Sequence, residues 1–433
     1  MIGMWDRRGA WCLAWVAAVA LGGCPGDDGG YSAETSTAGS STSAATDGST
    51  GSATSTDSLS TTGTDGADTT GDDDGTTTGL PMPPTEGCDG VPLMGNPGDP
   101  AARGPWPVGV TTVDLDGLQV EVWYPAVPDP EPGGPGERYD IRDQLPPEEA
   151  MKISDEDNPW QPCDCTRGLE IDTEHGPYPA VFFIHGTASF RTQSVAQMVH
   201  WASRGFVVLA ADHPGLRLGD LLGMLCGGPM VAQDIEGDVA KMIAAARGEA
   251  PGLEALSAQI DGTRIAVTGH SAGGSATASF GDEAQVLMPL AAGGVMDGSA
   301  LASTLVMGAM MDSVVAYSSQ TDGYDSSPAP KRLVGIGNQG HLAFSELCDL
   351  RNEAGEDLLT VAQNNGVCGA NFASFLFQCS EDFLDAAETR AIVNFATAAT
   401  LEETLQCSPI GDAFAQLVAL HPDVLELRTD PPL

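Results

Sequence analysis

The chain is 433 residues long and carries 60 acidic side chains against 18 lysines and arginines, a formal net charge of −42. A length of this order allows two or three domains. Such a negative balance argues against binding to nucleic acid and against attraction to an anionic membrane face. The composition changes sharply along the chain, which divides it into segments of different kinds.

Residues 1–23 have the pattern of a signal peptide. Arg7-Arg8 precede a short apolar run, 10–19, which is too short for a membrane span. The run ends in Leu21-Gly22-Gly23-Cys24, which resembles the lipobox of bacterial lipoproteins. The resemblance implies cleavage before Cys24, acylation of its thiol, and export to a bacterial membrane, facing the periplasm or the cell surface. An ordinary secretory signal with an incidental cysteine is the alternative reading.

Residues 24–86 follow as a linker of serine, threonine, glycine and aspartate, too polar to form a core. No later run of about twenty apolar residues predicts a second membrane segment. Residues 87–433 suit one large domain with insertions. In an exported chain its even number of cysteines predicts up to four disulfides, with the pairing left open. A metal site on Cys163-x-Cys165 is a weaker alternative, because no second ligand pair follows at suitable spacing. The cysteines are Cys88, Cys163, Cys165, Cys226, Cys348, Cys368, Cys379 and Cys407.

The domain opens with a predicted antiparallel hairpin. Two β-rich runs, 107–115 and 118–123, flank Asp116-Gly117, a dipeptide typical of tight hairpin turns. A stretch rich in proline, glycine and acidic residues, 126–177, is expected to form an irregular surface insertion.

Strand and helix patterns alternate after that insertion. The apolar runs are continuous, as expected of strands covered on both faces. Their alternation with helices predicts parallel strands joined by right-handed crossovers, and so an α/β fold with a mostly parallel, doubly wound sheet. Strands are predicted at 179–184, 206–211, 265–268, 286–290, 303–311 and 332–336, and helices at 194–204 and 234–246.

The strand at 265–268 leads into Gly269-His270-Ser271-Ala272-Gly273, a G-x-S-x-G motif followed by a helix of small residues. A strand, a tight turn and a helix form the context in which this motif presents a nucleophilic serine. The glycines two residues either side of Ser271 are needed because the turn leaves no room for a Cβ atom. The alternative is a glycine-rich turn without chemistry.

A serine hydroxyl needs an imidazole base, which in turn needs an orienting acid. In hydrolases of this fold the three residues occur in the order Ser, Asp, His, which leaves His341 and His421 as the base. His341 follows a strand and is favoured, whereas His421 lies in a late, helical tail. Asp312, just past the strand at 303–311, is the favoured acid. Its main rival is Asp297, with Asp322 and Asp325 as outsiders.

Residues 104–400 resemble bacterial α/β-hydrolases grouped as predicted dienelactone hydrolases. They are also similar to platelet-activating-factor acetylhydrolase-like enzymes and to bacterial polyester hydrolases (cutinases). The motifs behind the resemblance are G-P-W-P-V-G-V, V-E-V-W-Y-P-A, F-F-I-H-G-T, G-F-V-V-L-A-A-D-H-P-G, R-I-A-V-T-G-H-S-A-G-G, L-V-M-G-A-M-M-D and N-Q-G-H.

The resemblance implies roles for five residues. Ser271 is the nucleophile, Asp312 the orienting acid and His341 the general base, while the amides of Thr187 and Ala272 form the oxyanion hole. The chain departs from true dienelactone hydrolases, whose nucleophile is a cysteine. In acetylhydrolase-like relatives the acid follows the sixth strand, which keeps Asp297 open.

The predicted function is hydrolysis of carboxylic esters by a lipid-anchored serine hydrolase, with neither a metal nor an organic cofactor. The substrate would be a small ester, a lipid or a polyester. Two alternatives stay open: a catalytically silent surface binding module, and an amidase or peptidase of the same fold. The cysteine-bearing stretches 214–234 and 347–405 are expected to form either a lid or ordinary packing.

Overall fold

The computed structural model describes residues 85–127 and 136–432. The predicted signal peptide, Cys24 and nearly all of the linker lie outside the described residues. Among the described residues, no helix is long and apolar enough to cross a membrane.

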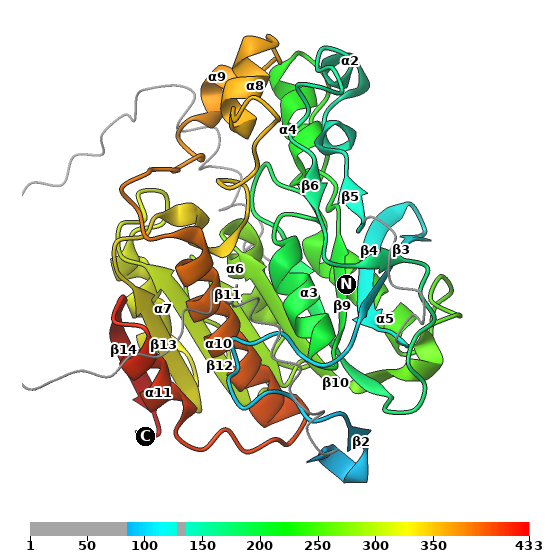
Figure 1. Ribbon diagram of the computed structural model, residues 1–433, viewed down its shortest axis with the longest axis vertical. Coiled ribbons are helices and arrows are strands. Elements are labelled where there is room, and N and C mark those ends of the chain that lie inside the picture. The colour runs from blue at the N-terminus through cyan, green and yellow to red at the C-terminus, as the bar shows by residue number, and fades with distance from the viewer. Residues whose placement is uncertain (1–84, 128–135, 433) are drawn as a thin grey trace, which may run out of the picture. The chain divides into compact units, whose positions relative to one another are not determined.

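A ten-stranded sheet organises the domain, in the order β14-β13-β12-β11-β10-β8-β9-β4-β3-β7 (Figure 1). Its six central strands, β13 to β9 in this order, pair parallel to one another. This mostly parallel sheet confirms the α/β prediction. The strands are β3 (Val108–Leu115), β4 (Leu118–Pro125), β7 (Thr166–Arg167), β8 (Tyr178–Ile184), β9 (Val207–Ala211), β10 (Ile260–His270), β11 (Val286–Leu290), β12 (Ser303–Ala309), β13 (Lys331–Ile336) and β14 (Val424–Asp430).

The predicted hairpin is confirmed by the antiparallel pairing of β3 with β4. The opposite edge of the sheet holds a strand that the sequence did not predict. Strand β14 pairs antiparallel with β13 after the chain has passed through the last helices. Its side chains are mostly half-exposed, so it lacks the continuous apolar run that marks the central strands.

Helices cover both faces of the sheet, because the central strands are apolar on both sides. On one face, α3 and α10 pack against the sheet in the larger core cluster, and both lie in front of it in Figure 1. On the other face, α5 contributes Val239, Met242 and Ile243 to a second cluster. The helices are α2 (Pro147–Ala150), α3 (Val195–Ser203), α4 (Leu218–Leu225), α5 (Ile235–Ala246), α6 (Ala272–Ala276), α7 (Tyr317–Ser326), α8 (Leu358–Asn364), α9 (Ala370–Ala373), α10 (Ala386–Leu405) and α11 (Ala413–Leu420).

A separate group of short elements stands at one end of the sheet, beyond the carboxyl ends of the central strands (Figure 1). We call residues 347–384, which include α8 and α9, together with α4 the cap. Its own apolar contacts are few. One small cluster joins Leu222 of α4 to Val361 of α8 and Ala370 of α9. Another joins Leu347 and Leu350 to residues beside the sheet.

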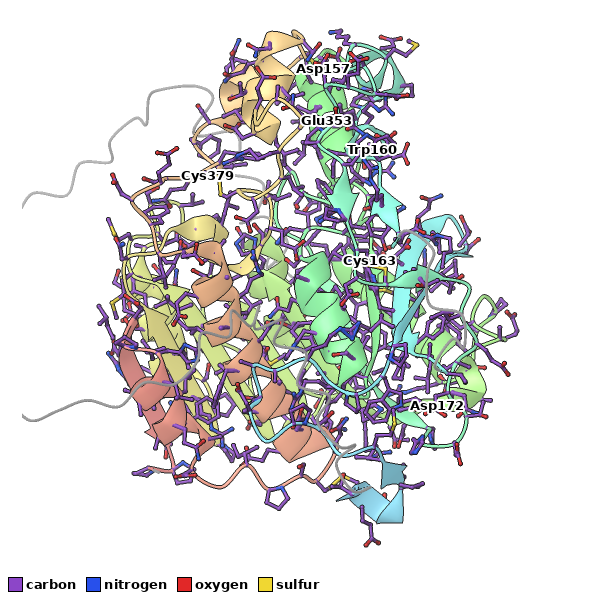
Figure 2. All side chains as sticks on the ribbon, in the orientation of Figure 1. Asp157, Trp160, Cys163, Asp172, Glu353 and Cys379 are labelled. Carbon is purple, nitrogen blue, oxygen red and sulfur yellow. A yellow bond between two sulfur atoms is a disulfide. The ribbon has the colours of Figure 1, made fainter. Side chains whose placement is uncertain are left out.

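Four disulfides join the eight described cysteines, as the even count predicted. Two of them hold the cap, Cys226–Cys368 and Cys348–Cys379. Cys88–Cys407 ties the start of the domain to the end of α10. Cys163 bonds to Cys165, so the metal site considered for this pair is wrong (Figure 2). The insertion around that pair is less irregular than expected, since it also contains β5 (Arg138–Tyr139), β6 (Gln161–Pro162), β7 and α2.

Candidate active site

The turn between β10 and α6 places Ser271 in a backbone conformation that few non-glycine residues adopt, with φ 57° and ψ −117°. Such a position is strained, and it persists only where its surroundings enforce it. The two motif glycines do so by allowing the chain to pack closely. A Cβ on Gly273 would lie 2.1 Å from the carbonyl oxygen of Ile184, and one on Gly269 would lie 2.5 Å from Gly273. The motif glycines are therefore required by this turn, as the sequence predicted.

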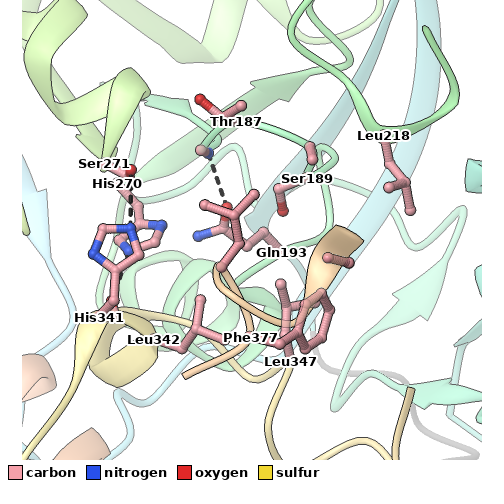
Figure 3. Close-up of a pocket in the computed structure, with 14 residues that line it drawn as sticks. Thr187, Ser189, Gln193, Leu218, His270, Ser271, His341, Leu342, Leu347 and Phe377 are labelled. Atoms are coloured by element: carbon pink, nitrogen blue, oxygen red, sulfur yellow. Dashed lines mark hydrogen bonds between the residues drawn. The ribbon is translucent and has the colours of Figure 1, made fainter. Parts of the chain in front are cut away.

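The structure brings Ser271, His341 and Asp312 together. His341 Nε2 lies 3.0 Å from Ser271 Oγ, and its Nδ1 lies 2.8 Å from Asp312 Oδ2. The first of these contacts is drawn in Figure 3. Both the imidazole and the carboxylate are buried, with 3% and 0% of their side chains exposed. The three side chains thus form a hydrogen-bonded chain that ends at the strained serine.

Asp312 is held by a full set of donors. Its Oδ1 accepts the backbone N–H groups of Val314 and Val315, both at 2.8 Å, and Gln320 Nε2 donates to Oδ2 at 3.1 Å. Three N–H donors fix the orientation of this carboxylate. The arrangement suits an acid that orients a histidine.

The rival residues lie elsewhere. Asp297 is exposed, and its carboxylate accepts only the neighbouring amide of Gly298. Asp322 and Asp325 lie on the surface of α7, where Asp325 pairs with Arg428. His421 contacts Glu388. Of the four aspartates considered, Asp312 is the one in contact with His341.

The backbone amides of Thr187 and Ala272, both near Ser271, have no acceptor among the described residues. The neighbouring amides are occupied: Ala188 donates to the carbonyl of Leu216 at 3.0 Å, and Gly186 donates to Gln193 Oε1 at 2.9 Å. Ala272 is the first residue of α6, where helix amides point outward without partners. Thr187 and Ala272 are therefore available to bind an oxyanion, whereas the amide that follows Thr187, that of Ala188, is already occupied.

His270 lies directly behind the base, although its role could not be predicted from the sequence. Its ring is centred 4.8 Å from that of His341, and its Nε2 lies 2.9 Å from the His341 carbonyl oxygen. Burial first, and the nearby His341 second, lower the pKa of His270 to about 3. The ring is consequently neutral near pH 7 and donates its Nε2 proton to that carbonyl.

A small pocket of about 40 Å³ adjoins Ser271. Figure 3 shows Leu218, Leu347 and Phe377 grouped at its side, away from Ser271. Leu218 comes from α4 and the others from residues 347–377, so the cap supplies much of the apolar wall. Ser189 is buried in the same lining, and its hydroxyl has no hydrogen-bond partner among the described residues. Of the two stretches considered, 214–234 and 347–405, α10 packs against the sheet in the larger core cluster, so residues 386–405 are ordinary packing. For the other residues the lid stays a prediction.

No group of three or more His, Cys, Asp or Glu side chains suited to a metal ion occurs within 85–127 and 136–432. His213, another histidine at a strand end, is fully buried and pairs with Asp238 at 3.2 Å. It does not line the pocket. The polar groups around the pocket come from the turn between β10 and α6 that carries Ser271, which we call the elbow, from the His341 loop and from the loop after β8.

Comparison with known families gives a match over part of the chain. A family model described as platelet-activating factor acetylhydrolase, isoform II, matches residues 160–215. That segment contains β8, the loop bearing Thr187, α3 and β9. A comparison with curated proteins finds no match. The family match supports an acetylhydrolase-like α/β-hydrolase that acts on esters. The likeness to polyester hydrolases and the lipoprotein signal stay predictions.

Proposed function

We propose that the protein is a serine hydrolase that cleaves carboxylic esters through an acyl-enzyme. The observation that carries the proposal is the hydrogen-bonded chain Asp312–His341–Ser271, which ends at a serine with positive φ beside two free amides. The acetylhydrolase family model matches residues 160–215, which include the loop bearing Thr187, and this match supports the same reaction.

The proposed reaction starts with proton transfer. Because Nδ1 of His341 donates to Asp312, its Nε2 carries a lone pair that accepts the Ser271 proton. The serine oxygen attacks the ester carbonyl, and the resulting oxyanion accepts hydrogen bonds from the Thr187 and Ala272 amides. Each such donor is worth about 3–4 kcal/mol in the transition state. His341 then protonates the leaving alcohol.

Deacylation reverses these roles. Water enters, His341 removes its proton, and the acyl group leaves as a carboxylic acid while Ser271 regains its proton. The residues described are sufficient for each proton transfer. The strained serine needs no rearrangement between the two halves of the cycle, because the elbow holds its oxygen at one place.

The test is hydrolysis of p-nitrophenyl acetate and butyrate by the full chain, compared with Ser271→Ala. We expect the variant to lose at least about 10³-fold in kcat/KM, as removal of a nucleophile does. Equal rates for the two proteins would refute the proposal. A fluorophosphonate that labels the wild type, but not the variant, would separate an enzyme from a silent binding module.

The comparison of matched ester and anilide substrates addresses the amidase alternative. An ester needs little help in expelling its alcohol, whereas an amide needs the base to protonate a poor leaving group. We expect ester turnover to exceed amide turnover by far, and a reversal would assign the site to an amidase.

We further propose that Cys24 carries the lipid anchor and that the domain works outside the cytoplasm of a bacterium. Four disulfides support an oxidising compartment, since such bonds persist mainly in exported proteins. The test is metabolic labelling with a fatty-acid analogue and membrane fractionation of the wild type and Cys24→Ser. Label and membrane association should both be lost in the variant, and their retention would contradict the anchor.

A further inference from the structure

One side chain of the cap bonds to both catalytic loops. The carboxamide of Gln378 lies between the residues that flank Asp312 and the backbone of His341. Its Oε1 accepts the N–H of Ser313 and the N–H of His341, both at 3.0 Å. Its Nε2 donates to the carbonyl of Met311 at 2.7 Å. Two N–H donors face the oxygen and one carbonyl faces the nitrogen, so the orientation of the amide is fixed by its partners.

These three bonds reinforce a direct backbone bond between the same two segments, from the Met311 N–H to the Gln339 carbonyl at 2.9 Å. Met311 and Ser313 are the residues on either side of Asp312, and His341 lies 29 residues beyond the acid. The Gln378 amide therefore bridges the backbone on either side of Asp312 and the backbone of His341.

The surrounding residues make room for this side chain and hold it in place. A Cβ on Gly340 would lie 2.9 Å from the Gln378 amide carbon and 2.6 Å from the Phe383 ring. On one side Gln378 is followed by Cys379, which is bonded to Cys348. On the other side it is preceded by Phe377, which lines the substrate pocket. Gln378 thus lies in the sequence between a disulfide-bonded cysteine and a residue of the pocket wall.

We infer that Gln378 is a positioning residue, through which the cap sets the distance between Asp312 and His341. The inference rests on the proposed function, since the pair it positions is the proposed acid and base. It adds a coupling: an acyl group that displaces Phe377 also displaces the neighbouring residue that aligns the catalytic pair. Pocket occupancy and catalytic alignment are then linked through one backbone segment.

The experiment compares Gln378→Met, which keeps the length of the side chain and removes all three bonds, with Gln363→Met. Gln363 is an exposed glutamine of α8 in the same cap. Because Gln378 touches the catalytic loops, we expect its variant to lose about 10- to 100-fold in kcat, with KM within about threefold of the wild type. The control should keep both constants within twofold.

A merely structural role would give another pattern. Phe377 and Leu376 line the pocket, so a loosened cap would change KM and melting temperature together with kcat. That joint change would overturn the inference, and so would a kcat equal to that of the control. An inactive wild type would instead refute the proposed function, which keeps the two failures distinct.

Gln378→Glu supplies a second readout. A glutamate keeps the two acceptor bonds, loses the donor to Met311, and places a negative charge near the base. The titratable groups that face the His341 ring are Asp312 and the neutral His270. An added carboxylate favours the protonated imidazole, so the acid limb of the kcat/KM profile should move up by about half a pH unit or more. An acid limb that coincides with that of the wild type would contradict the placement of this residue beside the base.

Discussion

The turn at Ser271 and the cap both line the pocket, but they are held in place by different forces. Around Ser271, buried parallel strands pack so closely that a Cβ on Gly273 would lie 2.1 Å from a carbonyl oxygen, which restricts the backbone of the turn. The cap has small apolar clusters, exposed Phe372 and Phe375, and two disulfides. The turn at Ser271 is therefore fixed by packing, whereas the cap depends on its disulfides and on small apolar clusters. Under the proposed function, catalysis depends on the first region and substrate fit on the second.

The largest effect on kcat is expected for a change in Asp312, the carboxylate that contacts His341. Asp312→Asn keeps the size of the side chain but turns a pure acceptor into a group that also donates, which favours the wrong tautomer of His341. We expect kcat to fall by about 10⁴-fold. Asp297→Asn, at the exposed rival position, should stay within twofold of the wild type, as measured by ester hydrolysis. If Asp297→Asn lost activity and Asp312→Asn kept it, the acid would be Asp297.

Gly273→Ala tests the rigidity of the elbow. The added Cβ would meet the Ile184 and His185 carbonyl oxygens at 2.1 and 2.5 Å, so strand or helix must shift. We expect a loss of about 3 kcal/mol or more in unfolding free energy and at least about 100-fold in kcat. Calorimetry and ester hydrolysis measure the two effects.

Gly223→Ala is the matched change in the cap. Gly223 lies in α4, and a Cβ there would meet nothing within 4 Å. A glycine-to-alanine change in an open helical position stabilises by about 0.5–1 kcal/mol. If Gly223→Ala lowered the unfolding free energy as much as Gly273→Ala, the cap would be packed as tightly as the turn at Ser271.

This difference also explains what the sequence could predict. The strands, the elbow and the order of Ser271, Asp312 and His341 follow from local patterns: apolar runs, glycines two residues either side of a serine, and polar residues at strand ends. The roles of Gln378 and His270 follow from contacts made only after folding, between residues up to 71 positions apart. The pairing of Cys226 with Cys368 is one of many that eight cysteines allow. Strand β14 was missed because half-exposed edge strands lack a continuous apolar run.

The cap should respond to the loss of one disulfide without harm to the catalytic group. Cys226–Cys368 links the end of α4 to the segment before α9, and both elements line the pocket. In Cys226→Ser/Cys368→Ser, Gln378 and the Cys348–Cys379 bond remain. Since the clusters beneath the cap are small, we expect it to open locally and KM to rise about tenfold, with kcat within threefold.

Limited proteolysis gives an independent measurement of this opening. New cleavage sites should appear between residues 347 and 384 in the double variant, while the sheet stays resistant. The single-serine variants serve as controls for the free thiol. Unchanged KM and unchanged cleavage would mean that the apolar clusters alone hold the cap.

The smallest predicted effect belongs to the rigid region and depends on pH. His200 lies in α3, with its Nε2 3.0 Å from the carbonyl oxygen of Pro100. Burial first, and the Arg204 guanidinium second, lower the pKa of His200 to about 3, below its value near 6.5 in an unfolded chain. Between these two values the unfolded state binds more protons, so this contribution to stability is present above pH 6.5 and is lost as the pH falls. It should amount to about 1 kcal/mol between pH 7 and 5.5.

The measurement is the change in unfolding free energy over that interval in the wild type and in His200→Gln. Glutamine supplies an N–H for the Pro100 carbonyl and does not titrate, so the variant should lose about 1 kcal/mol less on acidification. This difference arises from the burial of His200 in α3 beside Pro100 and Arg204, and no contact with the cap contributes to it. It should therefore survive unchanged in the Cys226→Ser/Cys368→Ser background. A difference that vanished in that background would show that loss of the disulfide alters the buried environment of His200, and the cap would then contribute to the structure of the region around α3.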